Sequence, residues 1–168
     1  MRKSSWVVSA TLASCLLLPA AASADGLFFG AKTGPMLLKD AVTSTSNIDS
    51  HPTNVGVLVG YDMGLVVGDI GVEGEYTTTV NKGKDILGND VSADTKAVYA
   101  SFRTAGPFYF KVKGGYIDRE VKVGSTTTKK TGSSYGAGLG FGIGIAQLEL
   151  ELTQMEKDAA FVSLGVQF

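Results

Sequence analysis

From Leu27 onward, hydrophobic and polar residues alternate along most of the chain with a period of two. A period of two places successive side chains on opposite faces of a β-strand, whereas an amphipathic helix has a period near 3.6. The pattern predicts strands over residues 27–36, 53–62, 66–77, 95–104, 107–118, 133–142, 145–154 and 159–168. The expected fold class is therefore all-β, with eight strands.

The lengths of the strands and of their connections point to a membrane protein. Several strands approach the ~9 to 11 residues that a tilted strand needs to cross a bilayer. The connections near Gly64, Gly106 and Gly144 are tight, and on the opposite side only the last connection, near 156–158, is short. The connections on the other side are long and polar and cover residues 37–52, 78–94 and 119–132. Tight turns at one rim and polar loops at the other predict a membrane-spanning, up-and-down antiparallel β-barrel.

Alternation alone does not say whether the apolar face points to lipid or into a soluble, lipocalin-like barrel. Glycines alternate with the apolar residues in segments 55–61 and 135–142. Small residues suit the narrow lumen of an eight-stranded barrel, whereas on a solvated outer face they would only weaken the strands. The apolar set is thus expected to face lipid. Aromatic residues of this set stand near strand ends, where interfacial girdles form, at Tyr61, Tyr76, Phe108, Tyr116 and Phe168.

The first 24 residues read as a cleaved secretory signal peptide. Arg2 and Lys3 precede an apolar run, and residues 22–24 (Ala-Ser-Ala) form a cleavage site, so that the barrel domain is expected to be residues 25–168. An uncleaved anchor and a lipoprotein signal ending at Cys15 are the alternatives. Cys15 is the only cysteine, so the mature chain would contain no disulfide bond.

Composition removes several classes of function. The net charge of -1 and the absence of a basic stripe argue against nucleic-acid binding. No phosphate-binding loop or paired metal ligands occur, so no cofactor and no metal are expected. His51 is the only histidine, and although serines and acids surround it, no catalytic motif does. We therefore expect no enzyme, with a lipid-modifying enzyme at the membrane rim as the alternative.

Charged side chains also occupy the face that the barrel turns inward. Strands one, three, five and seven lie a quarter-turn apart in a closed ring, so charge is expected to alternate basic, acidic, basic, acidic around the lumen. A plug of salt bridges is the favoured interpretation, because an eight-stranded barrel is narrow enough for side chains to fill it. A selectivity filter or a proton relay is the alternative. The expected members are Lys32, Asp69, Glu73, Glu75, Lys111, Lys113, Glu149 and Glu151, with Arg103 as a further base if it points inward.

Segments 29–34, 109–116 and 161–168 resemble the small outer-membrane β-barrels of Gram-negative bacteria, a group that includes the outer-membrane protein A barrel and the opacity-type porin-like proteins. The resemblance implies an outer-membrane location reached through the periplasm. It also implies that Phe168, which ends an alternating strand, is part of the signal recognised by the outer-membrane assembly machinery.

The expected function is a structural or surface-interaction (adhesion-like) role through the extracellular loops, with a lumen closed by salt bridges. A narrow porin or small-solute conduit is the alternative. Expected partners are outer-membrane lipid, lipopolysaccharide and the assembly machinery, with no nucleic acid, and the protein is expected to be a monomer. Lys122, Lys129 and Lys130 make the third long loop basic and are candidates for contact with lipopolysaccharide phosphates, although a solvated loop is the simpler explanation.

Overall fold

The computed structural model describes residues 26–38 and 48–168, and the predicted signal peptide lies outside them. No helix in the described part of the chain is long and apolar enough to span a membrane. The strands are β1 (Gly26–Leu38), β2 (Ile48–Ser50), β3 (Thr53–Leu65), β4 (Gly68–Asn81), β5 (Gly83–Asp85), β6 (Asp90–Thr104), β7 (Phe108–Val123), β8 (Thr126–Ile143), β9 (Ala146–Met155) and β10 (Ala159–Gln167).

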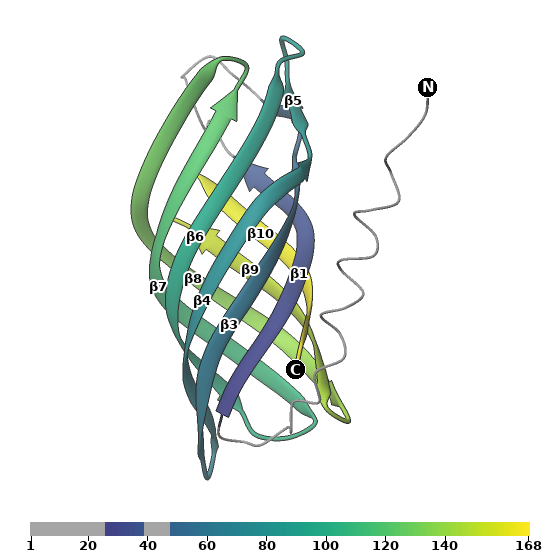
Figure 1. The fold of residues 1–168 in the computed structure, drawn as a ribbon, viewed down its shortest axis with the longest axis vertical. Coiled ribbons are helices and arrows are strands. Elements are labelled where there is room, and N and C mark those ends of the chain that lie inside the picture. The colour runs from purple at the N-terminus through teal and green to yellow at the C-terminus, as the bar shows by residue number, and fades with distance from the viewer. Residues whose placement is uncertain (1–25, 39–47) are drawn as a thin grey trace, which may run out of the picture.

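The eight long strands form one closed antiparallel barrel (Figure 1). β1 pairs with both β3 and β10, and β6 pairs with both β4 and β7, so every long strand has a neighbour on each side. Phe168 completes the seam, because its backbone exchanges hydrogen bonds of 2.9 and 3.1 Å with Phe29. The predicted fold class and strand number are confirmed.

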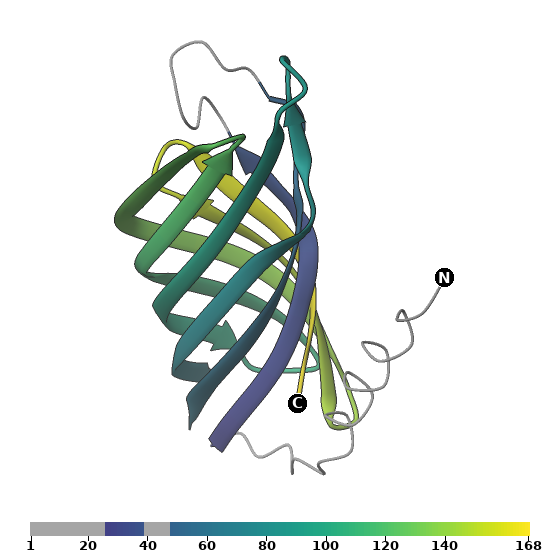
Figure 2. The ribbon, with the colours of Figure 1, turned by 45° about the horizontal axis from the view of Figure 1, so that its top comes forward.

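The two rims of the barrel differ in height. Gly26 and Phe168 lie at the rim where β3–β4, β6–β7 and β8–β9 are joined by tight turns, which we call the short-turn rim (Figures 1 and 2). At the other rim, β6, β7 and β8 rise beyond β9 and β10, and the short strands β2 and β5 extend the same sheet. We call the raised parts of the β5–β6 and β7–β8 hairpins the tall hairpins.

Two of the predicted long loops are wrong. Segment 119–132 is mostly strand, because β7 and β8 continue to a tight turn at Gly124–Ser125. Segment 78–94 likewise contains the ends of β4 and β6 and the whole of β5. Polar composition suggested loops, but these stretches keep the alternation of period two and are rich in Thr and Val, which favour strands even where water surrounds both faces.

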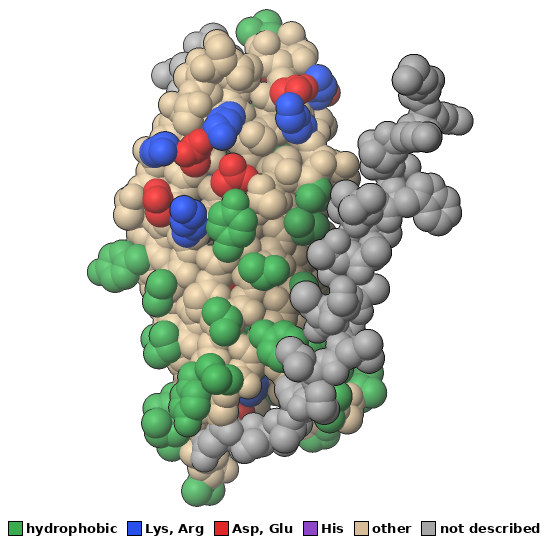
Figure 3. All heavy atoms as spheres, in the orientation of Figure 1, with side chains coloured by type: hydrophobic (Ala, Val, Ile, Leu, Met, Phe, Trp, Pro, Cys, Tyr) green, Lys and Arg blue, Asp and Glu red, His purple; other side chains and the backbone are tan. Residues whose placement is uncertain are grey.

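The outer face of the barrel is apolar around its middle. Exposed residues include Val57, Val59, Val72, Val98, Leu139, Leu150 and Leu164. In Figure 3, hydrophobic side chains cover the middle and lower part of the visible face, and charged side chains gather above them on the tall hairpins. The inner face has the opposite character, with buried charged groups at its centre.

Candidate functional site

The lumen begins at the short-turn rim with a cluster around Arg103. The guanidinium lies 2.6 Å from Asp62 Oδ2 and 3.1 Å from Asp69 Oδ2, and it also donates to Gln147 Oε1. Its cationic carbon lies 5.2 Å from the centre of the Tyr109 ring. A hollow of about 170 Å³ opens from this cluster toward the rim. Arg103 is therefore an inward-facing base, as its strand parity suggested.

Above Arg103, Lys111 forms the first part of a buried ion-pair network. Its Nζ lies 2.7 Å from Glu73 Oε2 and 3.2 Å from Glu149 Oε1. Tyr109 donates a hydrogen bond of 3.3 Å to the other oxygen of Glu149. Gly140 leaves the space that Tyr109 occupies, because a Cβ atom at this position would overlap the phenol ring. The glycines of β8 thus make room for long side chains of β7.

Lys113 is the centre of the network, with no exposed side-chain surface. Its Nζ contacts Glu75 Oε1 and lies 2.7 Å from Glu151 Oε1 and 3.4 Å from Glu73 Oε1. Lys32 reaches the same two carboxylates, at 2.6 Å from Glu75 and 3.2 Å from Glu151. Oxygens of the three glutamates lie within 4.8 Å of one another, a spacing that would suit a metal ion. The Lys113 ammonium, however, already contacts all three.

An apolar layer lies above the ion pairs. Tyr99 and Phe161 cover the network directly, since Lys113 Nζ lies 4.1 Å from the Tyr99 ring centre and Lys32 Nζ lies 5.4 Å from that of Phe161. The Tyr99 hydroxyl is hydrogen-bonded to Ser134 at 3.0 Å. The other buried members are Met36, Leu38, Val91, Ala93, Ala97, Ile117, Val121, Met155 and Ala159. Three tiers of side chains therefore occupy the lumen along its length.

The tall hairpins carry paired charges on both faces. Glu120 lies 2.9 Å from both Lys122 and Lys129, and Lys130 pairs with Asp158. Hydrogen bonds from the two lysines hold the pKa of Glu120 below its usual range. The three lysines expected to make this region basic thus share two carboxylates, which offset part of their positive charge.

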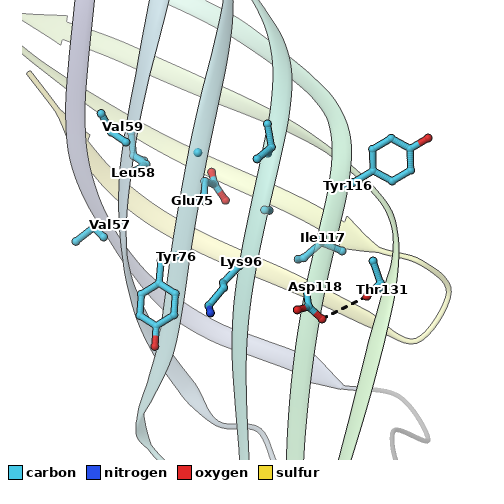
Figure 4. A pocket seen from close by; sticks show the side chains of 13 residues that line it. Val57, Leu58, Val59, Glu75, Tyr76, Lys96, Tyr116, Ile117, Asp118 and Thr131 are labelled. Carbon is cyan, nitrogen blue, oxygen red and sulfur yellow. Dashed lines mark hydrogen bonds between the residues drawn. The ribbon is translucent and has the colours of Figure 1, made fainter.

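A hollow of about 640 Å³ lies on the outer face where β3, β4, β6 and β7 run side by side (Figure 4). Apolar side chains line most of it, and Tyr76, Lys96 and Asp118 stand at the end nearest the tall hairpins. In the described part of the chain, no carboxylate lies within 4.0 Å of Lys96 Nζ, in contrast to Lys122, Lys129 and Lys130.

A closed barrel with an apolar outer face and a filled polar lumen is the architecture of a small transmembrane barrel. A family model described as "Outer membrane protein beta-barrel domain" matches residues 10–157. The chain belongs to this family. A comparison with curated proteins finds no match.

Solved structures of similar outer-membrane barrels agree in fold. The barrel is similar to Ail, the attachment invasion locus protein of Yersinia pestis, with 18% identity, a TM-score of 0.56 and coverage of 86% of this chain and 97% of Ail. It is also similar to Neisserial surface protein A, with 10% identity, a TM-score of 0.57 and coverage of 84% and 96%. The outer membrane enzyme PagL matches with 13% identity, a TM-score of 0.48 and coverage of 84% and 98%. Likenesses this distant show the fold alone.

Membership of the family places the protein in the outer membrane, as the sequence predicted. In such barrels the short turns face the periplasm and the longer connections face the outside. The short-turn rim is therefore periplasmic, and the tall hairpins are extracellular. Tyr76, Tyr116 and Tyr135 then mark the outer interface, and Tyr61 and Phe108 mark the inner one.

The eight charged residues expected in the lumen all point inward. Seven meet in the central network, and the eighth, Asp69, belongs to the Arg103 cluster at the periplasmic rim. His51 does not join a catalytic group: its Nδ1 accepts a hydrogen bond of 3.4 Å from the Leu38 backbone N–H, and its side chain is exposed. The absence of catalytic activity stays a prediction.

Two inward-facing residues were missed from the sequence. Asp62 was assigned to a tight turn, but β3 continues to Leu65 and its parity turns Asp62 toward Arg103. Arg119 was assigned to a loop, although it continues the inward parity of Lys111 and Lys113 on β7. Extending the alternation through the polar segments would have found both.

Proposed function

We propose that this outer-membrane barrel acts at the cell surface by presenting its tall hairpins to other macromolecules. The observation that supports the proposal is that β7 and β8 continue beyond the apolar band and stay paired with each other there. β8 pairs with β7 from Thr126 onward, whereas its pairing with β9 begins only at Ser134. Among the described strands, the edge of β8 from Thr126 to Gly132 has no second neighbour, since the Ser133 carbonyl accepts a hydrogen bond of 3.0 Å from the Glu156 backbone N–H.

A free strand edge supports a role in recognition, because its unpaired backbone groups are available to an extended segment of another chain. This class of function agrees with the names of two similar barrels. Ail is called an attachment invasion locus protein, and the other is called Neisserial surface protein A. Ail has also been solved with the heparin analogue sucrose octasulfate. Lys122, Lys129 and Lys130 share the two carboxylates of Glu120 and Asp158 here, so acids offset part of the positive charge that a sulfated ligand would meet.

The test shortens the raised part of the β7–β8 hairpin and leaves the ion-pair network in place. Deleting residues 119–122 together with 127–130 removes four facing pairs, keeps the Gly124–Ser125 turn and preserves the parity of both strands. We expect cells carrying the shortened protein to lose binding to host-cell surfaces or matrix while retaining the barrel in the outer membrane. Equal binding by the shortened and full proteins would overturn the proposal.

The second part of the proposal is that the lumen does not conduct solutes. The Arg103 cluster, the ion-pair network and the apolar tier of Tyr99 and Phe161 follow one another along the axis; the first is partly buried and the other two are buried. An eight-stranded barrel leaves little room beyond such side chains. Planar-bilayer recordings of the purified protein should show no steady conductance. A steady, ion-selective current would instead support the narrow porin.

A further inference from the structure

The hollow on the outer face contains one position without a side chain, Gly74. Two rows of outward residues cross the strands here: Val57, Tyr76, Lys96, Asp118 and Thr131 in the upper row, and Val59, Gly74, Val98, Tyr116 and Ser133 in the lower row. Gly74 is flanked by Val59 and Val98 in its row, and both valines are more than half exposed. A Cβ atom added at Gly74 would meet only the Val59 carbonyl oxygen, at 3.8 Å.

The position of the hollow decides what kind of molecule meets it. It opens outward in the apolar band, and Tyr76, in its upper row, places its upper end at the outer interface (Figure 4). Water is absent at this depth, so the molecule beside it is a membrane lipid. An acyl chain makes more contacts in a groove between fixed side chains than it makes on a flat strand surface. Each contact adds a small dispersion attraction that stabilises the bound chain.

The charge at the upper end selects the headgroup. Lys96 is the only cation lining the hollow, and among the described residues it has no carboxylate within ion-pair distance. Asp118 lies opposite it in the register and accepts a hydrogen bond of 3.4 Å from Thr131 Oγ1. A free ammonium at the interface, one row above an acyl-chain groove, matches a lipid with a phosphate at the base of its headgroup.

We infer that the Gly74 hollow is a binding site for one acyl chain of a phosphorylated glycolipid of the outer leaflet, of the lipid A type, with the phosphate on Lys96. The inference requires only the outer-membrane location and is independent of the role of the tall hairpins. Gly74 supplies the space, Tyr76 and Tyr116 form its walls, and Lys96 supplies the charge. Asp118 opposes the phosphate and thereby limits affinity.

The test measures bound lipid directly. Protein in phosphatidylcholine nanodiscs is titrated with lipid A carrying two phosphates or one, and bound lipid is counted by native mass spectrometry. Gly74→Leu fills the groove and should abolish retention of lipid A. The matched control is Gly114→Leu, one row nearer the periplasm on β7, where an added Cβ atom meets nothing within 4 Å and no part of the hollow is lined. This control should bind as the unaltered protein does.

Two charge variants test the headgroup in opposite directions. Lys96→Gln should weaken lipid A binding about fivefold, the loss expected for one basic residue near an anionic surface. Asp118→Asn should strengthen it. Equal loss in Gly74→Leu and Gly114→Leu, unchanged binding in Lys96→Gln, or equal retention of phosphatidylglycerol added in place of lipid A would each overturn the inference. Folding of every variant is checked by its gel mobility before and after heating.

Discussion

Arg119 is the least satisfied charged residue of the barrel. It lies on the inner side of β7 with 3% of its surface exposed, and its Nη1 atom has no hydrogen-bond partner among the described residues. Burial lowers the pKa of this guanidinium, because removing the cation from water costs free energy that Asp158 and Glu156 only partly offset. A residue of this kind reduces the stability of the fold that contains it.

Replacing Arg119 by methionine should therefore stabilise the protein. Methionine keeps the apolar contacts beside Ile117 and Val121 and removes the buried charge, for an expected gain of about 1 to 3 kcal/mol. Urea unfolding in detergent measures the change. Lys122→Met, at an exposed position of the same strand, serves as the control and should alter stability little. A loss of stability in Arg119→Met would show that the guanidinium has a favourable role.

At the scale of elements, the β5–β6 hairpin is held by a carboxylate between two lysines. Asp90 lies 2.5 Å from Lys84 Nζ and 3.0 Å from Lys82 Nζ, and these hydrogen bonds lower its pKa from 3.8 to about 2. A carboxyl group whose pKa falls on folding stabilises the folded hairpin above its unfolded pKa. That contribution is lost as the pH falls from about 4 to 2.

Hydrogen exchange of the β5–β6 backbone amides, corrected for intrinsic rates, should therefore show falling protection over this window. Asp85 has a lowered pKa in the same hairpin, through hydrogen bonds from Asn89, and contributes in the same direction. Asp90→Asn leaves Asp85 in place. The β5–β6 amides of this variant should therefore be less protected from exchange at pH 6, and their protection should fall less on acidification. An identical pH dependence in the variant would assign the effect to Asp85 alone.

The strand β10 is expected to act in assembly. The Phe168 ring stacks on Phe29 at 5.9 Å, and the two backbones pair at the seam between β10 and β1. Deleting Phe168 removes the last residue of the closing strand and the expected assembly signal, so most of the protein should fail to reach the outer membrane. Membrane fractionation measures the loss. Lys129→Ala with Lys130→Ala, on the tall hairpin, should insert normally, and normal insertion of the deletion variant would refute the assignment.

At the scale of the whole molecule, one network joins four strands across the lumen. Lys111→Glu with Lys113→Glu would place two more acids among Glu73, Glu75, Glu149 and Glu151. Breaking a buried pair on one side costs about 3 to 5 kcal/mol, and less where water enters the lumen. We expect a lower unfolding midpoint in detergent.

The compensating changes test whether the network acts as a unit. Adding Glu73→Lys and Glu75→Lys restores opposite charges at the same contacts and should recover part of the lost stability. Both variants should still insert, because the lipid-facing side chains are unchanged. Failure of the fourfold variant to recover any stability would mean that packing, and not charge, dominates this layer.

The sequence by itself determined the fold class, the number of long strands, the outward apolar face and the inward charges. The strands follow from the period of two, because a strand sends alternate side chains to opposite faces wherever it lies. The outward direction of the apolar face follows from the glycines that alternate with it, because small residues suit the narrow lumen. Alternation also predicted that Lys32, Glu73 and Glu151 face the lumen, although it did not identify their partners. Polar composition, in contrast, wrongly suggested loops at residues 119–132, where strands continue into water.

Only the tertiary structure decided which charges meet and which remain free. The register and shear of the closed barrel bring Lys113 to three carboxylates, place Asp62 beside Arg103 and leave Arg119 buried without a partner for one of its N–H groups. The same register aligns Gly74 with Val59 and Val98, so that a position without a side chain lies within the hollow on the outer face. Contacts of this kind join residues far apart in the chain, and their spacing is set by how the sheet closes, which local alternation does not encode.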